Sequence, residues 1–161
     1  MLTADRLREL LDYDPATGVF TWRVTRCGRA LAGNRAGSVD GQGYRWIGLD
    51  DRDYLEHRLA WLYTYGTLPS LEIDHIDRVR SNNAIGNLRH ATHGQNQANS
   101  GPQRNNISGI KGIYLTKSGR WMAQIKAAGT RRHLGTFDTA EEASAAYARA
   151  AELNFGEFAR S

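Results

Sequence analysis

The sequence predicts an α+β protein built from two modules, residues 1–99 and 110–161, joined by a linker at 100–109. Short segments with alternating apolar residues are interleaved with segments whose apolar residues recur at helical spacing, the pattern of antiparallel sheets mixed with helices. The stretch 100–109 is polar, contains glycine and proline and lacks apolar periodicity, as linkers do. We expect the second module to be a three-stranded antiparallel sheet packed on one helix.

The N-terminal module begins with leucines at helical spacing, which predict a short helix that ends at the acidic stretch 12–18. Residues 19–24 and 44–49 alternate like strands, and the glycine-rich stretch between them indicates a loop. A turn is expected at 50–53. Residues 57–66 then predict a buried helix that ends at a glycine.

The segment 71–99 is unusually polar and opens with a short alternating stretch typical of a strand. Thr92 and Gln95 stand three residues apart, the spacing of a capping box at a helix N-terminus. A short helix should therefore begin at His93 and carry Asn96 in its first turns.

Three alternating stretches in the second module, 110–115, 120–126 and 130–137, predict its strands, and an alanine-rich helix is expected from Thr139 to about Leu153. One face of the sheet is apolar and suits the small alanines of the helix. The opposite face resembles a major-groove reader in its chemistry, although an ordinary half-buried sheet with a hydrated face shows the same pattern. The polar residues predicted to point outward are Tyr114, Thr116, Gln124, Lys126, Arg131 and His133.

The net charge of +4 is unevenly distributed along the chain. Residues 78–137 contain ten Lys or Arg and no Asp or Glu, whereas residues 1–77 contain nine Arg and twelve acidic residues. A short charge run is usually a solvated face. A run of this length that also contains aromatic residues and histidines favours a polyanionic partner, of which nucleic acid is the commonest.

Cys27 is the single cysteine, which excludes an internal disulfide framework and any zinc site built on paired cysteines. The first ten residues are charged and lack the core of a signal peptide, and no apolar run approaches the length of a membrane span. We expect a cytoplasmic protein with no membrane partner, and we infer no obligate protein partner.

Asp74 and His75 come at the end of the strand predicted in the polar segment. Taken alone, such a pair is also typical of a surface charge pair. Hydrolysis of a phosphodiester requires a nucleophilic water and neutralisation of charge on the phosphate. Histidine suits the first task as a general base, and a carboxylate suits a hard cation such as Mg²⁺ for the second. Asn87 and Asn96 supply further side-chain oxygens downstream.

The sequence LEIDHIDRVRSNNAIGNLRHATHGQNQAN (71–99) resembles the core of HNH endonucleases of the kind found in phages and among homing endonucleases. The resemblance implies a ββα-metal nuclease site. In it His75 matches the general base, and Asp74 and Asn96 match the pair that holds the divalent metal. Asn87 matches the middle residue, which steadies the loop and the base histidine by hydrogen bonds.

The last motif position is Asn96 rather than the histidine that names the family, so this chain is an HNN variant. That ligand set favours Mg²⁺ or Mn²⁺ over nickel or zinc. Arg78 stands where the family often has glycine. Arg80 and Arg89 flank the motif and suit phosphate oxygens, although simple solubilising roles fit equally well. We interpret His57, at the start of a buried helix, as structural.

Nearly all of residues 108–159 resemble the plant ethylene-response-factor DNA-binding domain, which also occurs fused to phage HNH nucleases; GRWMAQI, LGTFDTAEEA and AYARAA carry the resemblance. That family binds DNA through its sheet, which implies DNA contacts from the six outward residues. We count Lys117 and Arg120 with them. His133 stands where the plant proteins usually have Trp, and Lys126 where they have Arg, so the plant target sequence does not carry over.

The sequence thus predicts a metal-dependent endonuclease of phage or homing type that cuts double-stranded DNA with some site preference, acting in the host cytoplasm if a phage encodes it. DNA binding should reside mainly in the second module and chemistry in the first. The alternative is a non-catalytic DNA-binding regulator with a relic HNH fold, against which stand four chemically competent site residues. An RNA-binding protein is a third class, but the sequence lacks the aromatic stacking platform of common RNA modules.

Overall fold

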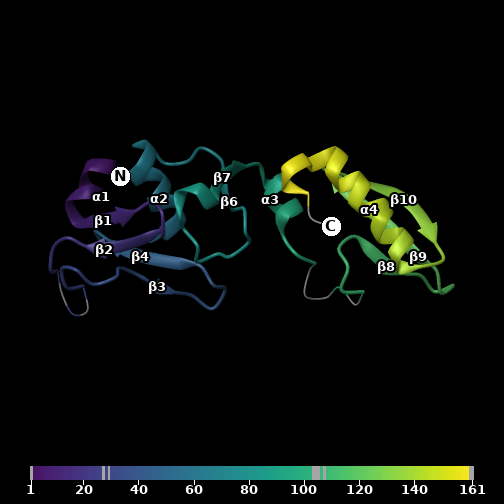
Figure 1. The fold of residues 1–161 in the computed structure, drawn as a ribbon, viewed down its shortest axis with the longest axis horizontal. Coiled ribbons are helices and arrows are strands. Elements are labelled where there is room, and N and C mark those ends of the chain that lie inside the picture. The colour runs from purple at the N-terminus through teal and green to yellow at the C-terminus, as the bar shows by residue number, and fades with distance from the viewer. Residues whose placement is uncertain (1, 27, 29, 103–105, 107, 160–161) are drawn as a thin grey trace. The chain divides into compact units, whose positions relative to one another are not determined.

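The protein divides into two compact units, Met1–His90 and Ala91–Ser161, in a computed structural model (Figure 1). The structure describes residues 2–26, 28, 30–102, 106 and 108–159. The division comes earlier than the linker predicted at 100–109, because the helix that follows residue 91 packs with the C-terminal elements. Cys27 and residues 103–105 and 107 of the predicted linker lie outside the described residues.

The first unit combines two helices with short antiparallel sheets. Strands β1 and β2 form a hairpin, β3, β4 and β5 form a three-stranded sheet in that order, and β6 pairs with β7. The elements are α1 (Ala4–Leu10), β1 (Leu11–Asp14), β2 (Val19–Trp22), β3 (Ser38–Val39), β4 (Arg45–Leu49), β5 (Arg52–Leu55), α2 (Glu56–Tyr65), β6 (Glu72–His75), the 3₁₀ turn η1 (Ile85–Asn87) and β7 (Leu88–Ala91).

Two of these strands differ from the sequence prediction. The acidic stretch predicted only to end the first helix is strand β1, because pairing with β2 buries Leu11 and Tyr13 beside Trp22 and Phe20. The turn predicted at 50–53 is confined to its first two residues, both with positive φ, and the chain then returns as β5. Such a two-residue turn matches the twist of the hairpin strands it joins.

The segment that contains Asn83 is held against the β1–β2 hairpin. The Tyr13 hydroxyl donates to the carbonyl of Asn83 (2.8 Å), and the Ile85 N–H donates to the carbonyl of Pro15 (3.1 Å). Gly18 has a φ of +73°, and a Cβ at this position would overlap the backbone of Asn83 and Ala84. The hairpin turn therefore approaches this segment as closely as only glycine permits.

Gly18→Ala is expected to lower the free energy of unfolding by roughly 2–4 kcal/mol, because it combines left-handed strain with a backbone clash. Urea unfolding of the two proteins measures the difference. Gly41→Ala is the matched control, since a Cβ there meets nothing within 4 Å. Equal unfolding midpoints for the Gly18 variant and the wild type would show that the close approach is absent.

The second unit is a helix-covered sheet preceded by a short helix. Its three strands are antiparallel in the order β10-β9-β8, with an irregularity in β10 between His133 and Gly135. The prediction of three strands followed by a helix is confirmed. The elements are α3 (His93–Asn99), β8 (Ile113–Leu115), β9 (Trp121–Ala127), β10 (Thr130–Phe137), α4 (Ala140–Phe155) and the 3₁₀ turn η2 (Gly156–Phe158).

Local sequence signals explain where the helices of this unit start. The capping box predicted from Thr92 and Gln95 is present at α3, and a second one joins Thr139 and Glu142 at α4. In each, the cap hydroxyl accepts from a backbone N–H and the side chain three residues on accepts from the N-cap N–H.

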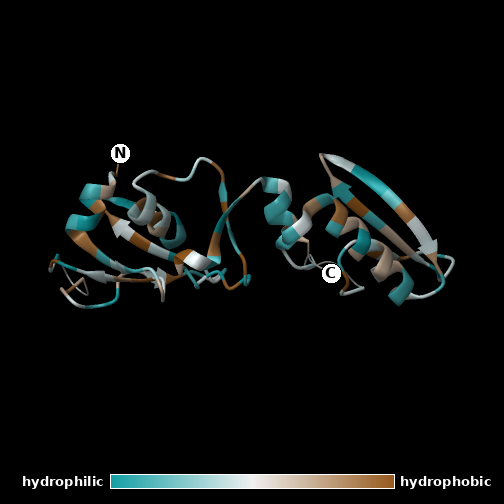
Figure 2. Ribbon diagram, turned by 45° about the horizontal axis from the view of Figure 1, so that its top comes forward, coloured by the Kyte–Doolittle hydropathy of each residue, from teal (hydrophilic) through white to brown (hydrophobic). Residues whose placement is uncertain are grey.

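The core of the second unit lies between α4 and the sheet. Hydrophilic and hydrophobic residues alternate along the strands (Figure 2). The apolar face buries Ile113, Ala123 and Ile125 against Ala143, Tyr147 and Ala151 of α4. Leu115, two residues after the buried Ile113, is 59% exposed because the edge strand β8 ends there. None of the helices in the described part of the chain is long and apolar enough to cross a membrane.

Candidate functional site

Strand β6 ends with two buried polar residues, Asp74 and His75, which are 4% and 6% exposed. The Asp74 carboxylate accepts from the guanidinium of Arg89 on β7, with 2.9 Å between Nε and Oδ2. Arg89, expected at a phosphate, is mostly buried in this ion pair. The pair neutralises the carboxylate in the structure as it stands.

Asn87 closes the loop that follows β6. Its Oδ1 accepts from the N–H of Asp77 (3.0 Å), and its Nδ2 donates to Asp77 Oδ1 and to the carbonyl of Asn82, both at 2.9 Å. Burial raises the pKa of Asp77, but hydrogen bonds headed by that from Asn82 outweigh it and hold the pKa below its usual value. Arg78 has a φ of +68°, which explains why glycine suits this position.

The His75 ring forms a hydrogen bond with Asn83, with 3.0 Å between Nε2 and Oδ1. The Asn83 amide nitrogen in turn donates to Oε2 of Glu56, the first residue of α2 (3.1 Å). Glu56 forms an ion pair with Arg45 of β4 at 2.6 Å. None of these three residues stands out in the sequence as a candidate for function. The signal that could have indicated Glu56 is a charged residue at the head of an apolar helix stripe.

The environment of His75 favours its neutral form. Burial lowers its pKa, although the hydrogen bond with Asn83 and nearby carboxylates raise it in part. His57 lies edge-on to the same ring, 5.1 Å between centroids, and burial lowers the pKa of His57 to about 3. A neutral imidazole can accept a proton, which is what a general base must do.

The depressed pKa of His57 predicts a loss of stability in acid. The unfolded chain takes up a proton near pH 6.5, whereas the folded protein resists it until about pH 3, so acidification favours unfolding throughout that interval. We expect His57 to account for about 3 kcal/mol of lost stability between pH 6.5 and pH 4. Urea unfolding of wild type and His57→Phe at several pH values measures this contribution, and the variant should show the shallower dependence.

His133→Gln is the matched control for this measurement, because His133 is exposed. It should follow the wild-type pH dependence. The prediction would be contradicted by a His57→Phe protein that loses stability in acid as steeply as the wild type.

Asn96, the fourth motif residue, lies on α3 and therefore in the second unit, whereas Asp74, His75 and Asn87 lie in the first. Helix α3 packs on α4 and η2, with Ala98 against Phe158. Within the described residues, no cluster of three or more His, Cys, Asp and Glu side chains suits a metal ion. One carboxylate and one amide oxygen nevertheless suit Mg²⁺, which retains several waters and takes phosphate oxygens as ligands.

Lys111 ties α3 to the rest of the second unit. Its ammonium group donates to three carbonyls where the helix ends, those of Gln97 and Ala98 at 2.6 Å and of Ser100 at 2.8 Å. A cation at this place compensates the negative end of the helix dipole. Lys111 thus holds the helix that carries Asn96.

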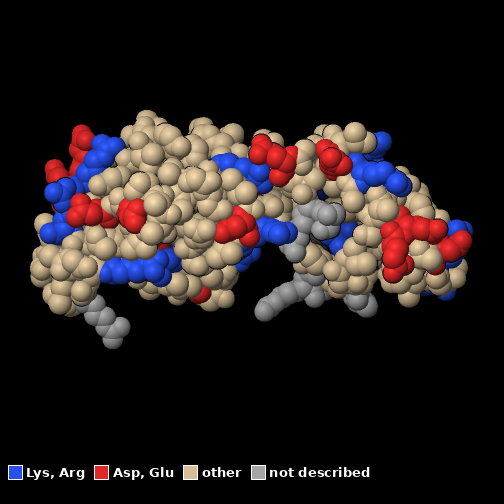
Figure 3. Space-filling view, viewed as in Figure 1, with Lys and Arg blue, Asp and Glu red and all other residues tan. Residues whose placement is uncertain are grey.

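The polar face of the sheet presents four of the predicted residues side by side. Strand pairing sets Arg131 opposite Lys126 and His133 opposite Gln124, and directly paired residues share a face. Lys126, Arg131 and His133 are exposed. On the face shown in Figure 3, acidic side chains gather at the start of α4, whose first turn carries two glutamates. Three acidic residues of this unit, Glu141, Glu142 and Glu152, lie on α4, while Asp138 precedes the helix and Glu157 lies in η2.

The turn between β8 and β9 uses two of the predicted DNA-binding residues for its own structure. The Thr116 hydroxyl accepts from the N–H of Arg120 (3.1 Å) and donates to its carbonyl (2.8 Å). The Arg120 guanidinium pairs with Asp138 at 2.9 Å. Lys117, between them, is exposed.

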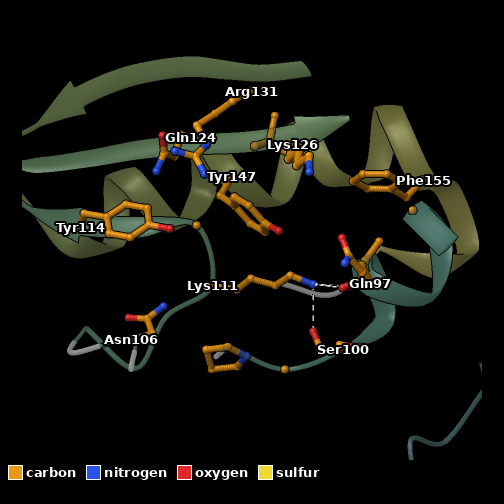
Figure 4. Close-up of a pocket in the computed structure, with 16 residues that line it drawn as sticks. Gln97, Ser100, Asn106, Lys111, Tyr114, Gln124, Lys126, Arg131, Tyr147 and Phe155 are labelled. Atoms are coloured by element: carbon orange, nitrogen blue, oxygen red, sulfur yellow. Dashed lines mark hydrogen bonds between the residues drawn. The ribbon is translucent and has the colours of Figure 1, made fainter. Parts of the chain in front are cut away.

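A cavity of about 630 Å³ opens beside the sheet, within the second unit (Figure 4). Tyr114, Gln124, Lys126 and Arg131 line it together with Lys111 and Tyr147. Four of the predicted DNA-binding residues therefore border one concave surface. Its cations are complementary to phosphate.

Arg80 of the first unit is exposed and held in place. Its guanidinium lies 4.8 Å from the centre of the Tyr44 ring, and Nη1 donates to the carbonyl of Gln42 (2.8 Å). These contacts orient the cation and leave much of it open to solvent.

The family model described as HNH endonuclease matches residues 54–98. Protein 3.8 of Escherichia phage T7 is 33% identical over 106 residues, covering 65% of this chain and 87% of that protein. An uncharacterized HNH endonuclease of Acanthamoeba polyphaga mimivirus is 34% identical over 105 residues, covering 64% of this chain and 54% of the relative. This chain thus spans about half the length of the mimivirus protein.

A third similar protein is the dehydration-responsive element-binding protein 2A of Arabidopsis thaliana. It is 40% identical over 62 residues, which cover 37% of this chain and 18% of the plant protein. No solved structure matches the chain.

Proposed function

We propose that this chain, in which residues 54–98 match the family model of HNH endonucleases, is a metal-dependent endonuclease that hydrolyses phosphodiester bonds of double-stranded DNA with site preference, in a phage or homing role. The observation that carries the proposal is the buried, neutral His75 beside Asp74 at the end of β6. A neutral imidazole next to a carboxylate supplies both a proton acceptor and a ligand for a hard cation.

In this proposal His75 takes a proton from the attacking water. Asp74 of the first unit and Asn96 of the second hold Mg²⁺ or Mn²⁺, which when bound would neutralise charge on the phosphate and stabilise the leaving oxygen. Asn87 fixes the loop after β6 through its bonds to the backbone. Arg80, oriented by Tyr44, contacts a DNA phosphate.

The second unit binds DNA through the polar face of its sheet. Its cations and the cavity beside β9 support this role, as does the similarity to a plant protein named for binding a DNA element. Thr116 and Arg120 shape the turn at the edge of this face. The residues that we propose to contact DNA are Tyr114, Gln124, Lys126, Arg131 and His133 on the strands and Lys117 in the turn.

Incubation of the full chain with supercoiled plasmid DNA, in Mg²⁺ or in EDTA, tests the function. We expect nicked or linear DNA only with the metal, and Asp74→Ala should require a higher Mg²⁺ concentration for half-maximal rate. Full cleavage in EDTA would contradict the proposed dependence on a divalent metal. A protein that binds DNA tightly and cleaves none with Mg²⁺ or Mn²⁺ would instead be a regulator with a relic HNH fold.

Replacement of Lys126 and Arg131 by alanine is expected to flatten the slope of log K against log salt by about one to two units, because each phosphate contact contributes about −0.9. The maximal cleavage rate at saturating protein should change little. Fluorescence anisotropy at several salt concentrations measures the slope.

Arg149→Ala is the control for charge, since Arg149 is exposed on α4, away from the sheet. It should leave the slope near the wild-type value. An unchanged slope in the Lys126/Arg131 double variant would show that these two residues do not contact DNA phosphates and that DNA binds to another part of the protein.

A further inference from the structure

A buried chain of one ion pair and two hydrogen bonds leads from Arg45 through Glu56 and Asn83 to His75. The four residues are 8%, 0%, 1% and 6% exposed. The successive contacts measure 2.6, 3.1 and 3.0 Å. The chain links β4, the start of α2 and the loop before η1 to the end of β6. A buried ion pair adds little net stability compared with apolar residues of similar size. We therefore interpret the Arg45–Glu56 pair as a device that orients the Asn83 side chain.

The charge at the far end of the chain is fixed. The Arg45 guanidinium stays protonated at any physiological pH, and it also donates to the carbonyls of Ala36 (3.0 Å) and Gly37 (3.2 Å). The buried pair is neutral overall only when Glu56 is ionised. An ionised carboxylate has no proton and can only accept hydrogen bonds.

The Glu56 carboxylate fixes the orientation of the Asn83 side-chain amide. The group that faces Glu56 must be a donor, so it is the NH₂, 3.1 Å from Oε2. The amide oxygen then faces the histidine ring. With the amide reversed, its oxygen would face the carboxylate, and two acceptors would be in contact.

The amide oxygen of Asn83 determines which nitrogen of the His75 ring is protonated. An oxygen without a proton can only accept, so the ring nitrogen 3.0 Å away, Nε2, must be the donor. A neutral imidazole carries one proton. Nδ1 therefore bears the lone pair.

We propose that Arg45, Glu56 and Asn83 are positioning residues that hold the His75 proton on Nε2 and so make Nδ1 the atom that takes the proton from water. This inference rests on the proposed nuclease function. In the step, a water O–H bond breaks, its proton goes to Nδ1, the oxygen attacks phosphorus, and the P–O bond to the leaving oxygen breaks. The resulting imidazolium keeps its Nε2–H bond to Asn83, which becomes charge-assisted and stronger.

The tautomer can be measured without any activity. Two-bond ¹H–¹⁵N correlation spectra of the full chain, free of metal and above neutral pH, distinguish a protonated ring nitrogen from one with a lone pair. We expect His75, assigned by the loss of its signals in His75→Gln, to show protonated Nε2 and unprotonated Nδ1. Protonated Nδ1, or an even mixture of the two forms, would overturn the inference.

The contribution of the ion pair is tested by Arg45→Met/Glu56→Leu, which removes both charges together and leaves neither one buried alone. We expect a mixed His75 tautomer and a kcat about tenfold lower, with the KM for DNA and the Mg²⁺ dependence unchanged. Arg45→Lys, which preserves the charge, should retain the wild-type tautomer and most of the rate. A double variant with wild-type spectra and kcat would exclude Glu56 and Arg45 from the positioning role.

The two proposals fail in different ways. A protein that never cleaves DNA but shows the proton on Nε2 contradicts the nuclease function and leaves the positioning chain in place. A protein that cleaves DNA with its proton on Nδ1 keeps the function and contradicts the chain.

Discussion

His75→Ala is expected to slow DNA cleavage by about 10²–10⁴-fold, the usual contribution of a general base. The substitution removes the proton acceptor that the structure keeps neutral by burial. DNA affinity should stay near the wild-type value, since the proposed sheet contacts belong to the other unit. Single-turnover cleavage at saturating protein, with anisotropy for binding, measures the two effects separately.

His133→Ala supplies the opposite pattern as a control. His133 is exposed on the sheet, so its loss should weaken DNA binding and leave the rate at saturation nearly unchanged. If His75→Ala cleaves within about twofold of the wild-type rate, well short of the loss expected for a base, His75 is not the base and the role inferred for it from the motif is wrong.

Arg45→Met alone is expected to lower the free energy of unfolding by about 3–5 kcal/mol, the usual cost of leaving a buried charge without its partner. Glu56 is fully buried, and burial already raises its pKa against the opposing effect of Arg45. Without Arg45 the carboxylate must either stay charged in the core or take up a proton. Urea unfolding at neutral pH measures the loss.

Arg45→Met/Glu56→Leu should recover most of that stability, because it removes both charges from the interior. Arg52→Met is the control for loss of an arginine, since Arg52 is exposed on the neighbouring strand β5. The interpretation would be wrong if the double variant were less stable than Arg45→Met, or if Arg52→Met cost as much.

Local signals in the sequence predict local structure well in this chain. The capping box at Thr92 and Gln95 involves only neighbouring residues, so spacing alone indicates the start of α3. Strand β1 was not predicted because two of its four residues are acidic and it is short, and only pairing with β2 makes these residues a strand. Tertiary pairing overrides propensity at such places.

The candidate site shows the same division. The positions of Asp74, His75 and Asn87 follow from the motif, since the chemistry of their side chains is apparent in the sequence. The partners that orient them do not. Asn83 lies 8 residues after His75 and Glu56 lies 27 residues before Asn83, so only the folded chain brings the three together.

The boundary between the two units was not predicted from the sequence, for a related reason. Composition marks 100–109 as a linker, and by composition alone α3 belongs with the segment before it. The contacts that attach α3 to the second unit are made by Lys111 and Phe158, which follow it in the chain. Neither leaves a periodic pattern that would reveal a helix docked on later elements.

The contacts of the Lys111 ammonium group with the end of α3 limit where recombination between related proteins can join their two units. A recombination that joined two relatives after residue 99 would pair one parent's α3 with the other parent's lysine and phenylalanine, and these contacts would have to match by chance. A junction at residue 90 transfers α3 whole, together with Asn96 and the sheet that follows. A protein that acquires a new sheet surface by recombination at residue 90 therefore also acquires the residue at position 96 of the same parent. Among descendants of such exchanges, the residue proposed to hold the metal and the choice of DNA target should therefore be inherited as one block.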